Sequence, residues 1–234
     1  MTRLLPFCCA LASVLPGACG EPGTSPDPFS ATGEMIAYSG GSAGAANACV
    51  TCHGLKGEGD GNLTPRLAGL DPGYLVRQLN NYAEGQRSHS RMAVVASRIS
   101  MQDRLQVASY YANLPAPDAC SAPMVASGLY AVGDPKRGIP ACASCHGAAG
   151  EGNAGNPPLA GQPSPYLVRQ LHDWREGNRY GDPNGDMTRI SKALTVAELA
   201  AWTDGDAVRQ DGTRRPESPA ECPPTRRGVP RNGA

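Results

Sequence analysis

The apolar and polar residues of this chain alternate with the period of α-helices. Apolar residues at three- and four-residue steps predict a helix that begins after Ser100, with one face formed by Leu105, Ala108, Tyr111 and Ala112. The string Tyr-Leu-Val-Arg-Gln-Leu from Tyr74 predicts another helix. We find no alternating strand pattern of useful length, and the stretches rich in Gly, Pro and Asn predict loops. We therefore expect an all-α fold.

Four short signals mark where helices should begin. Asp71-Pro72 and Ser164-Pro165 each place an N-cap residue before a proline at the first helical position. Ser100-x-x-Asp103 and Thr195-x-x-Glu198 have the form of capping boxes. The helix after Thr195 soon meets Asp204-Gly205-Asp206, so we expect it to be short.

The chain contains an internal repeat. Tyr74 to Leu79 recurs unchanged as Tyr166 to Leu171, 92 residues later. Two other strings recur at nearly the same distance, namely Gly57-Glu58-Gly59 as Gly150-Glu151-Gly152, and Pro65 to Gly69 as Pro157 to Gly161. The repeat predicts two tandem domains, residues 33–115 and 125–205, joined by a Pro-rich linker at 116–124.

Composition limits the class of protein. The 21 basic and 21 acidic residues balance, which argues against nucleic-acid binding and against strong attraction to a membrane surface. Aromatic residues make up 5% of the chain and include only two Phe, so a core built from side chains alone would be thin. A large apolar cofactor in each domain would supply the missing buried surface.

Residues 1–20 are typical of an export signal, and 21–32 of a linker. The uncharged stretch at 4–18 is too short for a membrane span. Two processing routes remain open, which are cleavage before Glu21 and attachment of a membrane-tethering lipid to Cys19. Either route predicts a periplasmic location, where cysteines meet an oxidising environment.

The candidate chemistry lies in a duplicated motif. Cys49-x-x-Cys52-His53 recurs as Cys142-x-x-Cys145-His146, 93 residues later. Two Cys on one helical turn can each form a thioether to a haem vinyl group, and the adjacent His can bind the iron. Cys-x-x-Cys-His is the attachment signature of c-type haem. Two copies in register therefore predict two covalently attached haem c groups.

The cysteines have three other possible uses. A Cys₄ zinc site would draw each Cys pair out of its own repeat and leave both histidines without a role. A thioredoxin-like redox pair needs a βαβ context that the pattern lacks. Structural disulfides are the third alternative. Outside the motifs, Cys120 and Cys222 could pair with each other.

A sixth iron ligand is expected from methionine. Met92 and Met187 hold equivalent places in the repeat, each just before the last helix. A Met thioether favours reduced iron and raises the potential. Met101 is a rival in the first domain, but its counterpart is Val196, which cannot bind iron. His89 is a further alternative, although the second repeat has no equivalent His.

The ligand histidines also need a hydrogen-bond acceptor that fixes the ring. We expect the carbonyls of Pro65 and Pro157 to serve, because proline has a stiff φ and no N–H of its own.

Taken together, these motifs resemble those of the dihaem cytochromes c of the cytochrome c4 family, over residues 33 to 202. The resemblance implies two class I cytochrome c folds, each with a few helices around one haem. It implies that Cys49, Cys52, Cys142 and Cys145 attach the haems, and that His53, Met92, His146 and Met187 are axial ligands. It further implies a periplasmic electron carrier without enzymatic activity. Its partners would be respiratory redox proteins, namely a terminal oxidase, a cytochrome bc1-type complex or a dehydrogenase.

The sequence departs from the family pattern in two places. The opening helix of the first domain contains Gly40, Gly41 and Gly44. In the second domain the closing helix gives way to a tail, residues 206–234, that is rich in Arg, Pro and Gly and is expected to be disordered. We therefore expect the second domain to be the less stable one.

Two alternative functions stay open. A dihaem peroxidase or a thiosulfate-oxidising cytochrome would need an open or labile iron site, which the repeated Met argues against. A cytochrome subunit of a dehydrogenase would share every haem feature with a free carrier.

Overall fold

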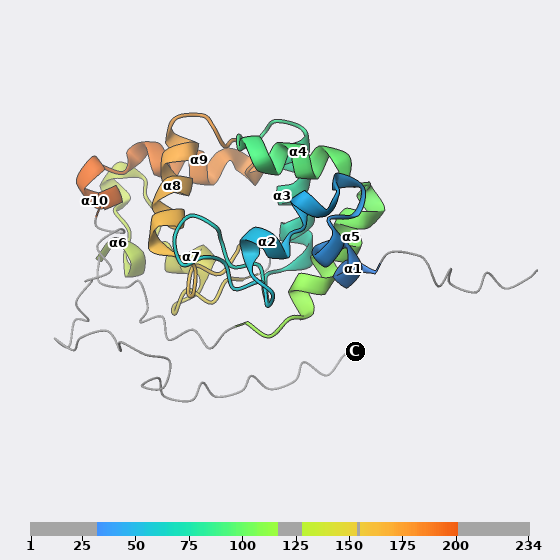
Figure 1. Ribbon diagram of the computed structural model, residues 1–234. Coiled ribbons are helices and arrows are strands. Elements are labelled where there is room, and N and C mark those ends of the chain that lie inside the picture. The colour runs from blue at the N-terminus through green and yellow to red at the C-terminus, as the bar shows by residue number, and fades with distance from the viewer. Residues whose placement is uncertain (1–31, 117–127, 154, 201–234) are drawn as a thin grey trace, which may run out of the picture. The chain divides into compact units, whose positions relative to one another are not determined.

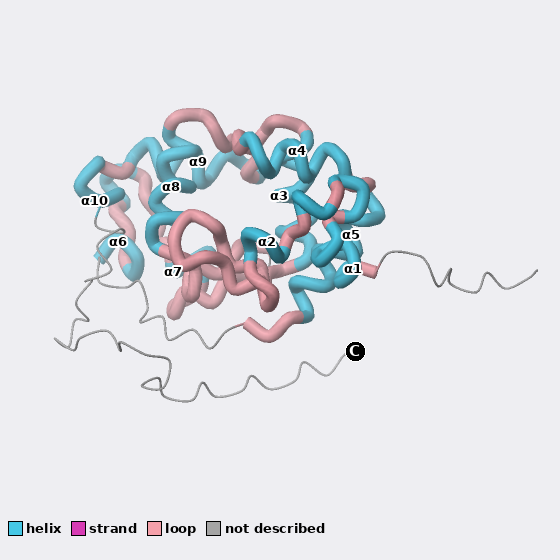
Figure 2. Tube along the Cα trace, in the orientation of Figure 1, coloured by secondary structure: helices cyan, strands magenta, loops and turns pink. Residues whose placement is uncertain are grey.

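The computed structural model describes residues 32–116, 128–153 and 155–200. Within these ranges the chain is helical, and its only strand-like pairings are isolated β-bridges, so the expected all-α class is confirmed (Figures 1 and 2). No helix in these ranges is long and apolar enough to cross a membrane. Several predicted features lie outside the described residues: the leader 1–20 with Cys19, most of the two linkers, Cys120, Cys222 and the tail 206–234.

The first half contains five α-helices and two 3₁₀ turns among its described residues. In chain order these are α1 (Gly33–Ser39), η1 (Gly41–Ala43), η2 (Ala45–Asn47), α2 (Val50–His53), α3 (Pro72–Ala83), α4 (Ser90–Arg98) and α5 (Met101–Asn113). The opening helix α1 is short because Gly40 follows it in the left-handed conformation, with φ of 76°. The first of the three glycines noted in the sequence therefore ends this helix early.

The second half contains five α-helices and two 3₁₀ turns among its described residues. In chain order these are α6 (Gly128–Ala131), η3 (Pro135–Arg137), α7 (Ala143–His146), α8 (Ser164–Arg175), η4 (Pro183–Gly185), α9 (Asp186–Ala193) and α10 (Val196–Ala200). Helices α7 and α8 have the same lengths as α2 and α3. Figure 1 shows α8 and α9 in the second half in places that correspond to α3 and α4 in the first.

Most of the predicted helix starts are confirmed. The side chain of Asp71 accepts the N–H of Tyr74 at 2.7 Å, and Pro72 opens α3. Ser100 forms a complete capping box with Asp103. Thr195 and Glu198 exchange two hydrogen bonds of the same kind, at 2.7 and 3.2 Å.

Two sequence expectations were wrong in detail. Ser164 does not cap its helix, because the extended residue before α8 is Pro163 and Ser164 already lies in the first turn. Leu105 is 48% exposed, and Val107 takes the predicted buried place beside Ala108 and Tyr111. Adjacent stripes on α5 both carry apolar residues, so periodicity alone did not identify the one that meets α1.

The core of the first half is formed where α5 packs on α1. Ile36 and Ala37 of α1 pack in one buried cluster with Val107, Ala108 and Tyr111 of α5. The two backbones approach closely at Gly33, where a Cβ atom would overlap the carbonyl of Gln106. α5 therefore packs against both α1 and α3.

The core of the second half lies between α8, α9 and α10. Its buried members are Ile139, Leu171, Trp174, Leu194 and Leu199. Leu199 on α10 is completely buried, so this short helix seals the second core as far as the structure describes it.

Candidate functional site

All eight side chains predicted to bind a cofactor line one cavity of about 1730 Å³. They are Cys49, Cys52, His53 and Met92 from the first half, and Cys142, Cys145, His146 and Met187 from the second. A pocket for one drug-sized ligand is about 300–1,000 Å³. The cavity is therefore large enough for two large groups.

The first motif forms a single helical turn. Cys49 precedes α2 in a right-handed helical conformation, and the N–H of His53 donates to its carbonyl at 2.9 Å. This turn brings Cys49, Cys52 and His53 to the cavity together. His53 is 8% exposed, and its Nδ1 donates a hydrogen bond to the carbonyl of Pro65 at 2.9 Å.

The second motif has the same geometry. Cys142 precedes α7, and the N–H of His146 donates to its carbonyl at 2.9 Å. The Nδ1 of His146 donates to the carbonyl of Pro157 at 2.8 Å. Both expected His–Pro hydrogen bonds are confirmed, and each leaves the Nε2 lone pair available for a metal ion.

Burial keeps both imidazoles neutral. Desolvation lowers the pKa of His53 and of His146, and the hydrogen bond to the proline carbonyl opposes this effect only in part. A neutral imidazole is the form that binds a metal ion.

The Gly-Glu-Gly strings fold the loop back onto the backbone of each motif histidine, a role that sequence reasoning did not assign. The N–H of Gly59 donates to the carbonyl of His53 at 2.8 Å, and the second repeat has the same bond from Gly152 to His146. Gly59 has φ of 80°, and a Cβ atom there would lie 2.5 Å from the carbonyl oxygen of Thr64. The loop can therefore close back on its histidine only with glycine at this position.

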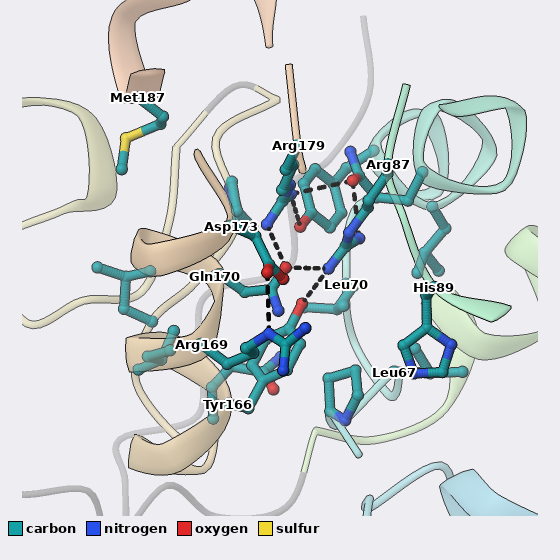
Figure 3. A pocket seen from close by; sticks show the side chains of 18 of the residues that line it. Leu67, Leu70, Arg87, His89, Tyr166, Arg169, Gln170, Asp173, Arg179 and Met187 are labelled. Carbon is teal, nitrogen blue, oxygen red and sulfur yellow. Dashed lines mark hydrogen bonds and ion pairs between the residues drawn. The ribbon is translucent and has the colours of Figure 1, made fainter. Parts of the chain in front are cut away.

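Met92 and Met187 both lie near the start of a helix at the cavity. Met92 is on α4 and Met187 on α9, and each side chain is partly buried. Figure 3 shows Met187 at the cavity. The rival Met101 is 51% exposed and lies outside the cavity lining. The Nδ1 of His89 accepts the N–H of Met92 at 3.2 Å, so His89 caps α4.

The chain matches the cytochrome c family over residues 39–114 and 139–206, which is more than half of its length. It belongs to the cytochrome c family.

Relatives narrow this to the dihaem cytochrome c4 type. The chain is 41% identical over 179 residues to a thiosulfate dehydrogenase electron acceptor from Stutzerimonas stutzeri, which covers 73% of this chain and 83% of that protein. It is 36% identical over 167 residues to cytochrome c4 from Thiocapsa roseopersicina. This alignment covers 69% of this chain and 86% of that protein. This cytochrome accordingly carries two covalently bound haem c groups and transfers electrons.

Two solved structures also align with this chain. Cytochrome c4 from Pseudomonas stutzeri aligns with a TM-score of 0.60 and 30% identity, over 71% of this chain and 95% of that one. A thiosulfate dehydrogenase from Marichromatium purpuratum aligns with a TM-score of 0.63 and 35% identity, over 82% of this chain. This cytochrome spans only 44% of that dehydrogenase chain.

The residues at the cavity fit haem c. None of the four motif cysteines forms a disulfide, so their sulfur atoms are available for thioether bonds to haem. In the parts of the chain that the structure describes, no group of three or more His, Cys, Asp or Glu residues could hold a metal ion, so the Cys₄ zinc alternative finds no support there. An imidazole with a fixed ring and a Met thioether are the donor pair that cytochromes c use for iron.

Two buried arginines at the cavity were missed by sequence reasoning. Arg87 and Arg179 are each 4% exposed and meet where the two halves touch. Single arginines outside a motif usually lie on the surface. Their equivalent positions in the repeat were the available signal.

Proposed function

We propose that this cytochrome is an electron carrier in which each haem iron has one His and one Met ligand. His53 and Met92 would bind the first iron, and His146 and Met187 the second. Cys49 and Cys52 would attach the first haem, and Cys142 and Cys145 the second. The observation that carries the proposal is the pair of His–Pro hydrogen bonds at 2.9 and 2.8 Å, found in both halves beside a Met that lines the same cavity.

Six-coordinate iron suits electron transfer rather than chemistry at the metal. An iron with both axial positions filled changes oxidation state with little rearrangement and leaves no position for a substrate. His53 and His146 are held by stiff proline carbonyls, so each ring stays in one orientation through the redox cycle. We therefore favour the carrier over a peroxidase-type enzyme.

We further propose that this cytochrome acts in the periplasm. Its electron donor would be a thiosulfate-oxidising dehydrogenase, and its acceptor would be a respiratory oxidase. The likeness to a thiosulfate dehydrogenase electron acceptor supports this choice of donor. A second candidate, a cytochrome bound permanently to such an enzyme, is supported by the alignment with part of a thiosulfate dehydrogenase chain. Co-purification of a dehydrogenase with the tagged cytochrome from its native host would favour the second candidate.

The first test is the visible and far-red absorption spectrum of the oxidised protein, taken with its haem content. We expect two haems per chain and a Met-to-iron charge-transfer band of the strength expected for two such ligands. A band of half strength would show that one of the two methionines does not bind iron. Thiosulfate alone should leave both haems oxidised, whereas thiosulfate with a catalytic amount of thiosulfate dehydrogenase should reduce both. Reduction by thiosulfate alone would instead support the enzyme alternative.

A further inference from the structure

Arg87 and Arg179 lie side by side at the contact between the two halves. Their segments form an antiparallel bridge in which Ser88 N–H donates to the carbonyl of Asn178 at 2.7 Å, and Tyr180 N–H donates to that of Gln86 at 2.9 Å. Both guanidinium groups line the large cavity, and Figure 3 shows them facing each other across a set of hydrogen bonds.

Each arginine donates hydrogen bonds to both halves. Arg87 donates to Gln78 of its own half at 2.8 Å, and to Tyr166 and Gln170 of the other half at 2.9 and 2.6 Å. Arg179 reciprocates with Gln170 of its own half at 2.9 Å, and with Gln78 and Tyr74 of the other half at 2.9 and 3.3 Å. The arrangement has the symmetry of the repeat.

An aromatic ring lies beneath each cation. Arg87 lies over the ring of Tyr82 at 4.6 Å, and Arg179 lies over the ring of Trp174 at 3.9 Å. Such stacking stabilises a buried guanidinium and holds its plane. Tyr82 and Trp174 are again 92 residues apart, so the stacking belongs to both repeats.

The two positive charges have no carboxylate partner in the protein as far as the structure describes it. Their hydrogen-bond acceptors are neutral amide and phenol oxygens, and neither arginine forms an ion pair with an Asp or Glu there. Asp173, which is also buried, pairs with Arg169 at 2.8 Å. Arginine stays charged in proteins, and buried charges are normally paired. Each guanidinium also has more N–H donors than the three hydrogen bonds it makes.

We propose that Arg87 and Arg179 form one shared site for the carboxylates of both haem groups, and that this site couples the redox potentials of the two haems. Every haem c carries propionate carboxylates, and a planar guanidinium is well suited to bind such groups. The proposal rests on the proposed function, because it needs a haem in each half.

Coupling follows because Arg87 and Arg179 share the acceptors Gln78 and Gln170. Reduction removes one positive charge from an iron, so nearby cations favour the reduced state and raise the potential. A change at either arginine should therefore reach both haems. Arginines that served one haem each would instead affect their own haem alone.

The test uses the full dihaem protein and measures both midpoint potentials by spectroelectrochemical titration, with each haem identified by its NMR-shifted haem methyl signals. Arg87→Gln and Arg179→Gln should each lower the potential of both haems. Gln78→Glu should do the same, because it places a carboxylate between the two guanidinium groups. Arg98→Gln, on the exposed last turn of α4, is the matched control and should leave both potentials unchanged.

The result that would overturn the proposal is a shift confined to one haem, or no shift, in variants that keep two haems and the full far-red band. If an Arg→Gln variant fails to fold, Gln78→Glu, which preserves the side-chain shape, decides the question. Failure of the proposed function would look different, since it would appear as a missing haem or a missing Met band in the unaltered protein.

Discussion

Removal of the Asp182 carboxylate should loosen Met187 selectively. Its oxygens accept the N–H of Met187 at 2.9 Å and that of Thr188 at 3.2 Å, and also accept the hydroxyl of Thr188 at 2.9 Å. Gly185 holds the N-cap position of α9, and the Asp182 carboxylate acts as the capping acceptor from the preceding segment, which fixes the turn that carries the proposed iron ligand. Asp182→Ala removes all three hydrogen bonds.

The size of the effect follows from these contacts. Loss of a helix N-cap costs about 0.5–2 kcal/mol, and the additional hydroxyl bond contributes about 0.5–1 kcal/mol. A total of about 1–3 kcal/mol corresponds to about a 5- to 150-fold change in an equilibrium constant. The open state of the second haem, in which Met187 has left the iron, should become more populated by that factor.

Imidazole binding to the oxidised protein measures this opening. Imidazole occupies the iron only when Met has left, so its apparent affinity at the second haem should rise about 5- to 150-fold in Asp182→Ala. The first haem serves as an internal reference, and Asp182→Asn should restore most of the cap because Asn is also a preferred N-cap residue.

Asp186→Ala is the matched control. Asp186 lies in the first turn of the same helix, and its ion pair with Arg189 at 3.2 Å is more than half exposed on both sides. Such a pair contributes about 0–1 kcal/mol. If imidazole binds equally well to Asp182→Ala and to the unaltered protein, or if Asp186→Ala has the same effect as Asp182→Ala, the capping argument is wrong.

Three other predictions concern stability. Gln162→Ala should lower the free energy of unfolding by about 1–3 kcal/mol, because the Gln162 amide accepts the Arg66 N–H at 3.0 Å and donates to the Arg66 carbonyl at 2.9 Å. An unchanged midpoint of denaturant unfolding would contradict this. The hydrogen bond from Arg137 lowers the pKa of Glu198 from 4.5 to about 2, so its stabilising effect should be complete above pH 4.5 and lost as the pH falls toward 2. Glu198→Gln should flatten this acid-side decline in melting temperature, and an unchanged decline would refute the assignment. Leu199→Ala should lower the free energy of unfolding of the second haem domain by about 2–5 kcal/mol, because Leu199 is completely buried. In denaturation followed at each haem, the second haem signal should then be lost first. Earlier loss of the first haem signal would be the contrary result.

The sequence was sufficient for features that depend on neighbouring residues. Helix caps such as Asp71 and Ser100 act within one turn, so their side chains alone predicted the starts of α3 and α5. The His–Pro hydrogen bonds were also predictable, because the repeat placed a proline at nearly the same distance after each motif, 12 residues after His53 and 11 after His146. The ligand assignments and the domain boundaries remain predictions.

Features that depend on tertiary contacts were not predictable. Leu105 and Val107 are both apolar on neighbouring stripes of α5, and only the close approach of α1 selects the buried one. Arg87 and Arg179 look like surface residues in the sequence, since their burial depends on the way in which the two halves meet. The expected lower stability of the second domain concerns residues beyond 200 as well, and denaturation of the unaltered protein, followed separately at each haem, tests it.

The two repeats agree where a residue touches the cofactor site and differ in the surrounding contacts. His, Pro and the Gly-Glu-Gly string recur with nearly equal geometry. The cap of the Met-bearing helix is His89 in one half and Asp182 in the other, and the buried Asn81 is matched by the charged Asp173. Because the proposed iron ligands are the same in both halves, we expect a difference between the two haem potentials to come from this outer layer. A carrier built by duplication can therefore set two potentials while its iron-binding groups stay unchanged.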